Sequence, residues 1–148
     1  MPLAVGEDRS GLRRRYVEAW RKRQRGAPLE PLEHQIVTVL EEHPEYWCVV
    51  EDGADSLARD YRPEDGQTNP FLHLGLHLAI REQVGTDRPP GIAFVHGELC
   101  RQLGDRHAAE HRMIECLGAA LWESQRLNRA PDEASYLESL RRLVAARK

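Results

Sequence analysis

The stretch NPFLHLGLHLAI, residues 69–80, decides the fold, because its pattern fits either a strand or a helix. In steps of two, its leucines alternate with His73 and His77, as in a half-buried strand. Up to residue 79, however, the stretch holds no Val, Ile, Thr or Tyr, and the Asn-Pro pair that opens it is a typical helix start. We therefore predict a helix over residues 70–84, apolar on nearly all sides and central in the fold.

Five further helices are predicted on either side of this one. Each combines apolar residues at three-and-four spacing with a cap, a proline or a glycine at its ends. They span about residues 10–24, 31–43, 90–103, 105–127 and the segment from Asp132 onward. Between them, residues 51–68 form a polar stretch with little periodicity, which predicts a long loop. The predicted fold class is all-α, a bundle of about six helices around a central apolar helix.

Length and composition predict a single helical domain over residues 1–148. Hydrophobic residues make up 41% of the chain and charged residues 30%, as in ordinary globular proteins. No apolar run is long enough for a membrane span, and the N-terminus has acidic residues where a secretory signal needs an apolar core. We therefore expect a cytoplasmic protein without membrane contact. Three cysteines without CxxC spacing indicate reduced thiols.

Two histidine pairs carry the chemistry that the sequence suggests. His73 and His77, like His107 and His111, are four residues apart, so each pair shares one helix face. Both pairs fall in the first two turns of their helices. If the helices from residue 70 onward run up, down and up, the pairs lie at one end of the bundle. The preceding helix would end there too, and its end carries His43.

A set of imidazoles with one carboxylate predicts a transition-metal site. His73, His77, His107 and His111 are the predicted ligands, and Glu110 is either a fifth ligand or a base toward a bound water. Such a donor set suits Zn, Fe, Ni or Cu, and does not suit Ca or Mg. The alternative is structural, since a histidine on an apolar helix face is commonly a hydrogen-bonded core residue. We interpret His34 and His96 as surface or packing residues, although His96 has ligand spacing to Cys100.

Several enzyme classes are disfavoured by the same residues. The segment from His107 to His111 reads HxxEH, the inverted zinc-protease motif, but only 37 residues follow it and the predicted fold has no strands. Neither pair is preceded by the glutamate of the diiron ferritin pattern. The chain also lacks a phosphate-binding loop and a dinucleotide fingerprint. Whether the protein is an enzyme is left open by its sequence.

Long segments of the chain resemble a bacterial family of unknown function. They are GQTNPFLHLGLHLAIREQ (66–83), TDRPPGI, HAAEHRMIECLGAALWESQR (107–126) and APDEASYLE. The resemblance implies no activity, but it implies that the histidine pairs and Glu110 are family features. Where the family has HPEYH, this chain has HPEYW. Trp47 thus replaces a histidine that would pair with His43, which leaves the role of His43 open.

The charge distribution suggests a second, non-metal function. Residues 1–26 hold eight Lys/Arg against three Asp/Glu, and residues 27–69 hold two against eleven. The basic first helix could dock a protein partner or nucleic acid, through the arginines Arg13, Arg14, Arg15, Arg21 and Arg23. The alternative is that two neighbouring helices complement each other's charge. A third interpretation is a metal-free small-molecule pocket lined by the histidines, with loop 51–68 as its lid.

Overall fold

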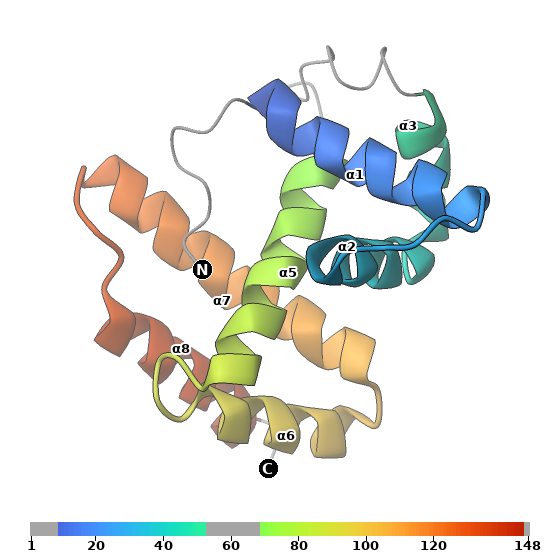
Figure 1. The fold of residues 1–148 in the computed structure, drawn as a ribbon. Helices are drawn as coiled ribbons and strands as arrows, with labels where there is room; N and C mark the ends of the chain where they lie inside the picture. The colour runs from blue at the N-terminus through green and yellow to red at the C-terminus, as the bar shows by residue number, and fades with distance from the viewer. Residues whose placement is uncertain (1–8, 53–68, 147–148) are drawn as a thin grey trace. The chain divides into compact units, whose positions relative to one another are not determined.

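The computed structural model describes residues 9–52 and 69–146, and every regular element in these ranges is a helix (Figure 1). The all-α prediction is therefore confirmed for the described residues, which hold seven α-helices and one short 3-10 helix. The elements are α1 (Arg9–Gln24), α2 (Pro31–Glu41), η1 (Pro44–Tyr46), α3 (Trp47–Asp52), α5 (Pro70–Thr86), α6 (Ile92–Leu103), α7 (Arg106–Arg126) and α8 (Glu133–Ala146). None of these helices has the length and apolarity that a membrane crossing requires.

The helix starts that matter for the site are set by local hydrogen bonds. At the start of α5, the Asn69 side-chain oxygen accepts from the N–H groups of Phe71 and Leu72, the second and third residues of the helix, at 3.1 and 3.2 Å. Asp105 caps α7 by accepting from the His107 N–H at 3.0 Å. These bonds satisfy amides that have no partner within the helix itself. Both starts were predicted from the sequence, and both place histidines in the first two turns.

The segment after α2 is more regular than predicted. Helix α2 ends at Glu41, but the chain continues as η1 and then as the six-residue helix α3, which the sequence analysis did not predict. A helix this short shows no clear periodicity, and its residues include two adjacent valines, which favour strands. Tertiary contacts hold it: Val50 is buried, and the Trp47 indole N–H donates to the Leu40 carbonyl at 2.7 Å. Residues 51 and 52 thus end a helix, and the rest of the predicted loop, 53–68, lies outside the described residues.

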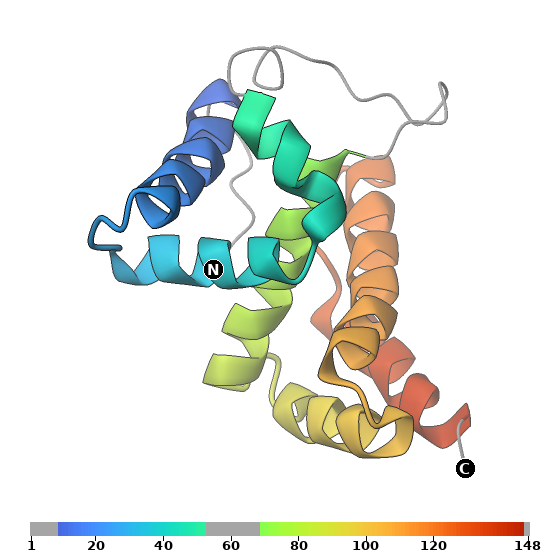
Figure 2. The same cartoon turned by 90° about the vertical axis from the view of Figure 1, so that its right-hand side faces the viewer.

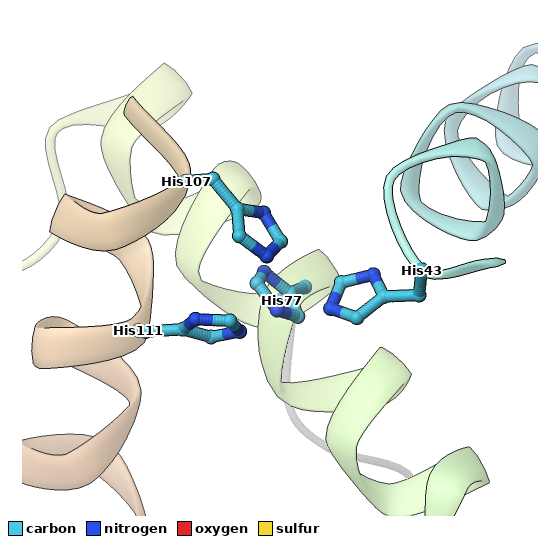
Figure 3. A group of neighbouring side chains, drawn as sticks. All are labelled: His43, His77, His107 and His111. Atoms are coloured by element: carbon cyan, nitrogen blue, oxygen red, sulfur yellow. The ribbon is translucent and has the colours of Figure 1, made fainter. Parts of the chain in front are cut away.

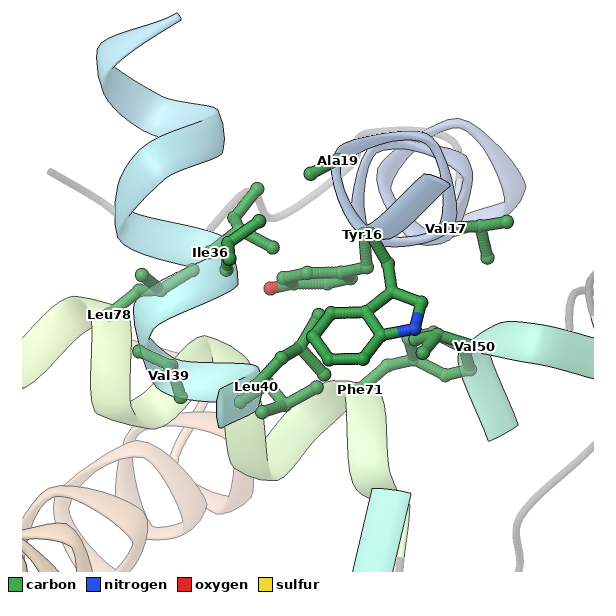
Figure 4. Close-up of a cluster of buried hydrophobic side chains, with 12 residues drawn as sticks. Tyr16, Val17, Ala19, Ile36, Val39, Leu40, Val50, Phe71 and Leu78 are labelled. Carbon is green, nitrogen blue, oxygen red and sulfur yellow. The ribbon is translucent and has the colours of Figure 1, made fainter. Parts of the chain in front are cut away.

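The chain divides into two compact units, and the division falls between Leu78 and Ala79, within α5. In the N-terminal unit, α1 packs against α2 and α3. Figure 4 shows the shared core, in which Tyr16 of α1 and Leu40 of α2 lie beside Phe71 of α5. The Tyr16 and Phe71 rings are 5.8 Å apart, and burial raises the pKa of the Tyr16 phenol to about 12. The first two turns of α5 are therefore fixed by apolar packing.

In the C-terminal unit, α6, α7 and α8 pack against one another. A tight turn at Gly104, whose φ of +66° lies in the left-handed region that favours glycine, connects α6 to α7 (Figure 2). The last turns of α5 join this unit through the Tyr136 hydroxyl, which donates to Gln83 at 2.7 Å. Helix α5 thus supplies buried residues to both units, as the prediction of a central apolar helix requires. The single-domain prediction stays a prediction.

The basic helix α1 is matched by acidic residues of α2. Lys22 lies 2.8 Å from Glu33, and Arg23 lies 3.1 Å from Glu41. This pairing confirms that the two helices complement each other's charge. Two arginines that the nucleic-acid hypothesis needs are engaged within the protein. Arg23 is paired with Glu41, and Arg13 is buried with its guanidinium over the Phe71 ring.

We expect a buried and an exposed leucine on α5 to differ sharply in their contribution to stability. Leu74 is 1% exposed and Leu72 is 55% exposed. Leu74→Ala should lower the free energy of unfolding by about 2–5 kcal/mol, because it leaves a cavity in the core. Leu72→Ala should change it by less than about 1 kcal/mol. Urea denaturation measures both, and equal losses would contradict the packing described for α5.

The α2 capping residue Glu33 should make stability depend on pH. Its pKa is held below its usual value by the Glu30 N–H, at 2.9 Å, and then by Lys22. A carboxylate with a lowered pKa in the folded state stabilises the fold above its unfolded-state pKa, and this contribution is lost as pH falls through the folded-state pKa. Glu33→Gln should therefore lower the urea midpoint at neutral pH.

The difference between Glu33→Gln and the wild type should shrink as the pH falls from about 5 to about 3. Glu51→Gln, an exposed change at the end of α3, is the control for the general effect of removing one negative charge. A Glu33→Gln effect that stays constant over this pH range would show that the carboxylate charge does not stabilise the α2 cap.

Candidate metal centre

His43 occupies a buried position just after α2, at the N-cap of η1. Its Nδ1 lies 2.9 Å from the Val39 carbonyl oxygen. A carbonyl can only accept a hydrogen bond, so Nδ1 carries a proton, and in the neutral form of this tautomer the lone pair is on Nε2. Metal-bound histidines are commonly held in this way, with the second nitrogen donating to a carbonyl. The structure thus favours His43 as an Nε2 donor.

The predicted pair on α5 lies beside His43. The ring centroids of His73 and His77 are 4.7 Å apart, and His43 lies 5.1 Å from the first ring and 4.6 Å from the second. The Nε2 atoms of His73 and His77 are 3.1 Å apart. Two nitrogens bound to one metal at about 2.1 Å are separated by about 3.0–3.4 Å, so this spacing matches adjacent ligands. The N-terminal unit therefore brings three imidazoles together.

Tyr46 contacts the same three-histidine group and was missed by the sequence analysis. Its ring stacks on His43 with centroids 5.5 Å apart and planes at 7°, and it meets His73 edge-on at 5.9 Å. Burial raises the pKa of the Tyr46 phenol, as does the nearby Glu45. The stacking restricts the rotation of the His43 ring about its Cβ–Cγ bond. Only the unpredicted helix η1 places Tyr46 here, so the sequence carried no strong signal for it.

The second predicted pair lies on α7 in the C-terminal unit. His107 and His111 are half-buried, and their ring centroids are 4.2 Å apart. One ring nitrogen of His107 lies within 4.8 Å of one ring nitrogen of His111. In the N-terminal unit, one ring nitrogen of His43 lies within the same distance of one ring nitrogen of His77 (Figure 3). The prediction that each HxxxH pair shares one helix face is thus confirmed. Each pair offers two ring nitrogens as candidate ligand atoms.

Glu110 lies between the two α7 histidines in sequence, and its carboxylate is engaged by arginine. The side chain is 1% exposed, and both of its oxygens accept from Arg81 Nε, at 3.0 and 3.2 Å. Arg106 approaches to 3.9 Å. The sequence analysis missed Arg81, although its position four residues after His77 extends the same face of α5. Ligation or base catalysis by Glu110 stays a prediction, and either role would have to compete with this ion pair.

The other histidine with ligand spacing has a different environment. His96 Nε2 lies 3.6 Å from Cys100 Sγ on α6. Burial lowers the pKa of His96 and raises the pKa of the Cys100 thiol, so both groups are neutral near pH 7. Cys48, Cys100 and Cys116 form no disulfide. The remaining histidine, His34, is exposed on α2, as predicted.

The Arg81–Glu110 ion pair should show strong coupling in a double-mutant cycle. Arg81→Gln leaves a buried carboxylate without its guanidinium partner and should cost about 3 kcal/mol of the free energy of unfolding. The double change Arg81→Gln/Glu110→Gln should cost at least about 1 kcal/mol less than the sum of the single changes. Urea denaturation measures the cycle.

The exposed pair Arg142–Glu138 in the same unit is the matched control for this cycle. Its coupling should stay below about 0.5 kcal/mol, because solvent screens both charges. Additive single effects at Arg81 and Glu110 would show that their contact contributes no net stability.

Searches of the curated proteins and of the solved structures gave no match. The chain does match one family, described as a domain of unknown function (DUF1841), over residues 8–142. This match covers most of the chain and agrees with the resemblance to a family without assigned activity. The protein therefore belongs to the DUF1841 family.

Proposed function

We propose that the protein binds one transition-metal ion through His43, His77, His107 and His111. These are the four side chains of Figure 3, and each offers one ring nitrogen as a ligand atom. The observation that carries the proposal is that each unit holds two histidines with ring nitrogens at ligand spacing. They are His43 and His77 in the N-terminal unit and His107 and His111 in the C-terminal unit. Three or four imidazole donors suit Zn, Fe, Ni or Cu and are a poor donor set for Ca or Mg.

Helix α5 carries both a proposed ligand and the arginine that contacts α7. His77 and Arg81 are one turn apart on this helix, so they share a face. Arg81 in turn contacts Glu110, which lies on α7 between His107 and His111. A single helix therefore carries the proposed ligand His77 and the arginine that contacts Glu110.

The proposal places His43 among the four ligands where the sequence analysis predicted His73. His43 is buried and has its Nδ1–H held by a carbonyl, whereas His73 is only half-buried. A ring that is already oriented loses less conformational freedom on binding. His73 stays a predicted additional ligand, because its Nε2 has the spacing to His77 that adjacent ligands show.

The test is elemental analysis by plasma mass spectrometry on untagged protein, purified without chelators or metal columns. We expect about one equivalent of Zn, Fe, Ni or Cu in the wild type. His77→Ala and His111→Ala should each lower it to well below half an equivalent, because each removes a ligand from one pair. His34→Ala is the matched control, since this exposed histidine lies outside the site.

Full metal content in both His77→Ala and His111→Ala would contradict the proposal. So would wild-type protein that binds no ion after anaerobic reconstitution with each metal. A loss in His77→Ala alone would restrict the site to the N-terminal unit. Comparison of His43→Ala with His73→Ala then decides which of the two belongs to the primary ligand set.

A further inference from the structure

The proposed ligands bring no negative charge to the ion. Among the described residues, the one group that could hold a metal consists of four histidines and contains no carboxylate or thiol. Neutral imidazoles leave the full charge of a divalent ion in place. Two of the four rings, His43 and His77, are buried, where an uncompensated charge is costly.

Glu110, the acidic residue that the sequence predicts for the site, is already ion-paired with arginine. Both oxygens of Glu110 accept from Arg81, which is only 16% exposed, and Arg106 lies 3.9 Å away. The carboxylate and the two guanidinium groups together carry a net charge of about +1. Arg81, Arg106 and Glu110 together therefore add positive charge near the histidines of α7. As a group they supply none of the negative charge that a divalent ion requires.

We infer that the bound ion takes a small anion with an oxygen donor as a further ligand. The carboxylate of a small organic acid fits this requirement, and hydroxide derived from water fits it when no acid is present. The inference rests on the proposed metal site and defines the class of ligand that this site accepts.

Cobalt-substituted protein provides the test, since the visible spectrum of Co(II) reports on both metal binding and added ligands. The first step is loading the wild type with one equivalent of Co(II). The second is a titration with sodium acetate, and in parallel with acetamide, its uncharged analogue of nearly the same shape. Sodium perchlorate keeps the ionic strength constant, because screening weakens long-range charge effects.

We expect acetate to change the Co(II) spectrum with saturation, and acetamide at the same concentration to leave it unchanged. The charge on the Arg81–Glu110 pair should then tune acetate affinity in opposite directions. Glu110→Gln removes a negative charge and should tighten acetate binding about tenfold, whereas Arg81→Gln should weaken it about tenfold.

The double variant Arg81→Gln/Glu110→Gln keeps the net charge of the pair and is the control for altered packing. Its acetate affinity should stay within about threefold of the wild type, and it is the variant expected to fold best if a single change is too destabilising. Circular dichroism and the Co(II) spectrum before acetate addition verify that each variant is folded and loaded.

The outcomes separate the two proposals. If Co(II) binds but acetate and acetamide have the same effect, the anion inference is wrong and the metal site stands. If Co(II) does not bind, both proposals are wrong. Shifts in the same direction for Glu110→Gln and Arg81→Gln would also overturn the inference, because they would show that the charge of the pair does not control the ligand.

Discussion

The structure depends on the burial of α5, a helix that is apolar on nearly all sides. An amphipathic helix needs one packing partner, but a helix of this kind must be covered around most of its surface. Its early residues Phe71, Leu74 and Leu78 join the core of the N-terminal unit, and Ala79 and Ile80 are buried at the start of the C-terminal unit. The same helix therefore contributes to the core of each unit, and its rigidity limits how its polar residues can be arranged.

The polar residues on α5 are placed at one-turn intervals, at His73, His77 and Arg81. An ionisable group buried in an apolar helix is costly unless it has a partner. His77 meets the rings of His73 and His43, and Arg81 meets the carboxylate of Glu110. These partners explain how the helix tolerates its polar face. They also place neutral nitrogen donors and a compensated ion pair along one side of a helix, which is the arrangement on which the proposed metal site depends.

The environment of His43 shows how backbone geometry prepares a side chain for ligation. His43 follows α2, which ends at Glu41, and Pro44 begins η1 directly after it, while the Val39 carbonyl one turn before His43 accepts its Nδ1–H. Tyr46 then stacks on the ring. Trp47 packs with Trp20 and donates to the Leu40 carbonyl. Trp47 therefore contributes to the packing of α1 and α2, and His43 has neighbouring imidazoles on α5.

Local sequence determined the helices and the geometry of each histidine pair. Caps, prolines and three-and-four spacing act over a few residues, so Asn69, Asp105 and the two HxxxH pairs could be predicted directly. Tertiary structure decided the contacts that join distant residues. Arg81 and Glu110 are 29 residues apart, and the six-residue helix α3 has too few residues for a periodic signal. The expected antiparallel helices already predicted His43 at the same end as His77, but the direct contact of the two rings, with centroids 4.6 Å apart, was decided by tertiary packing.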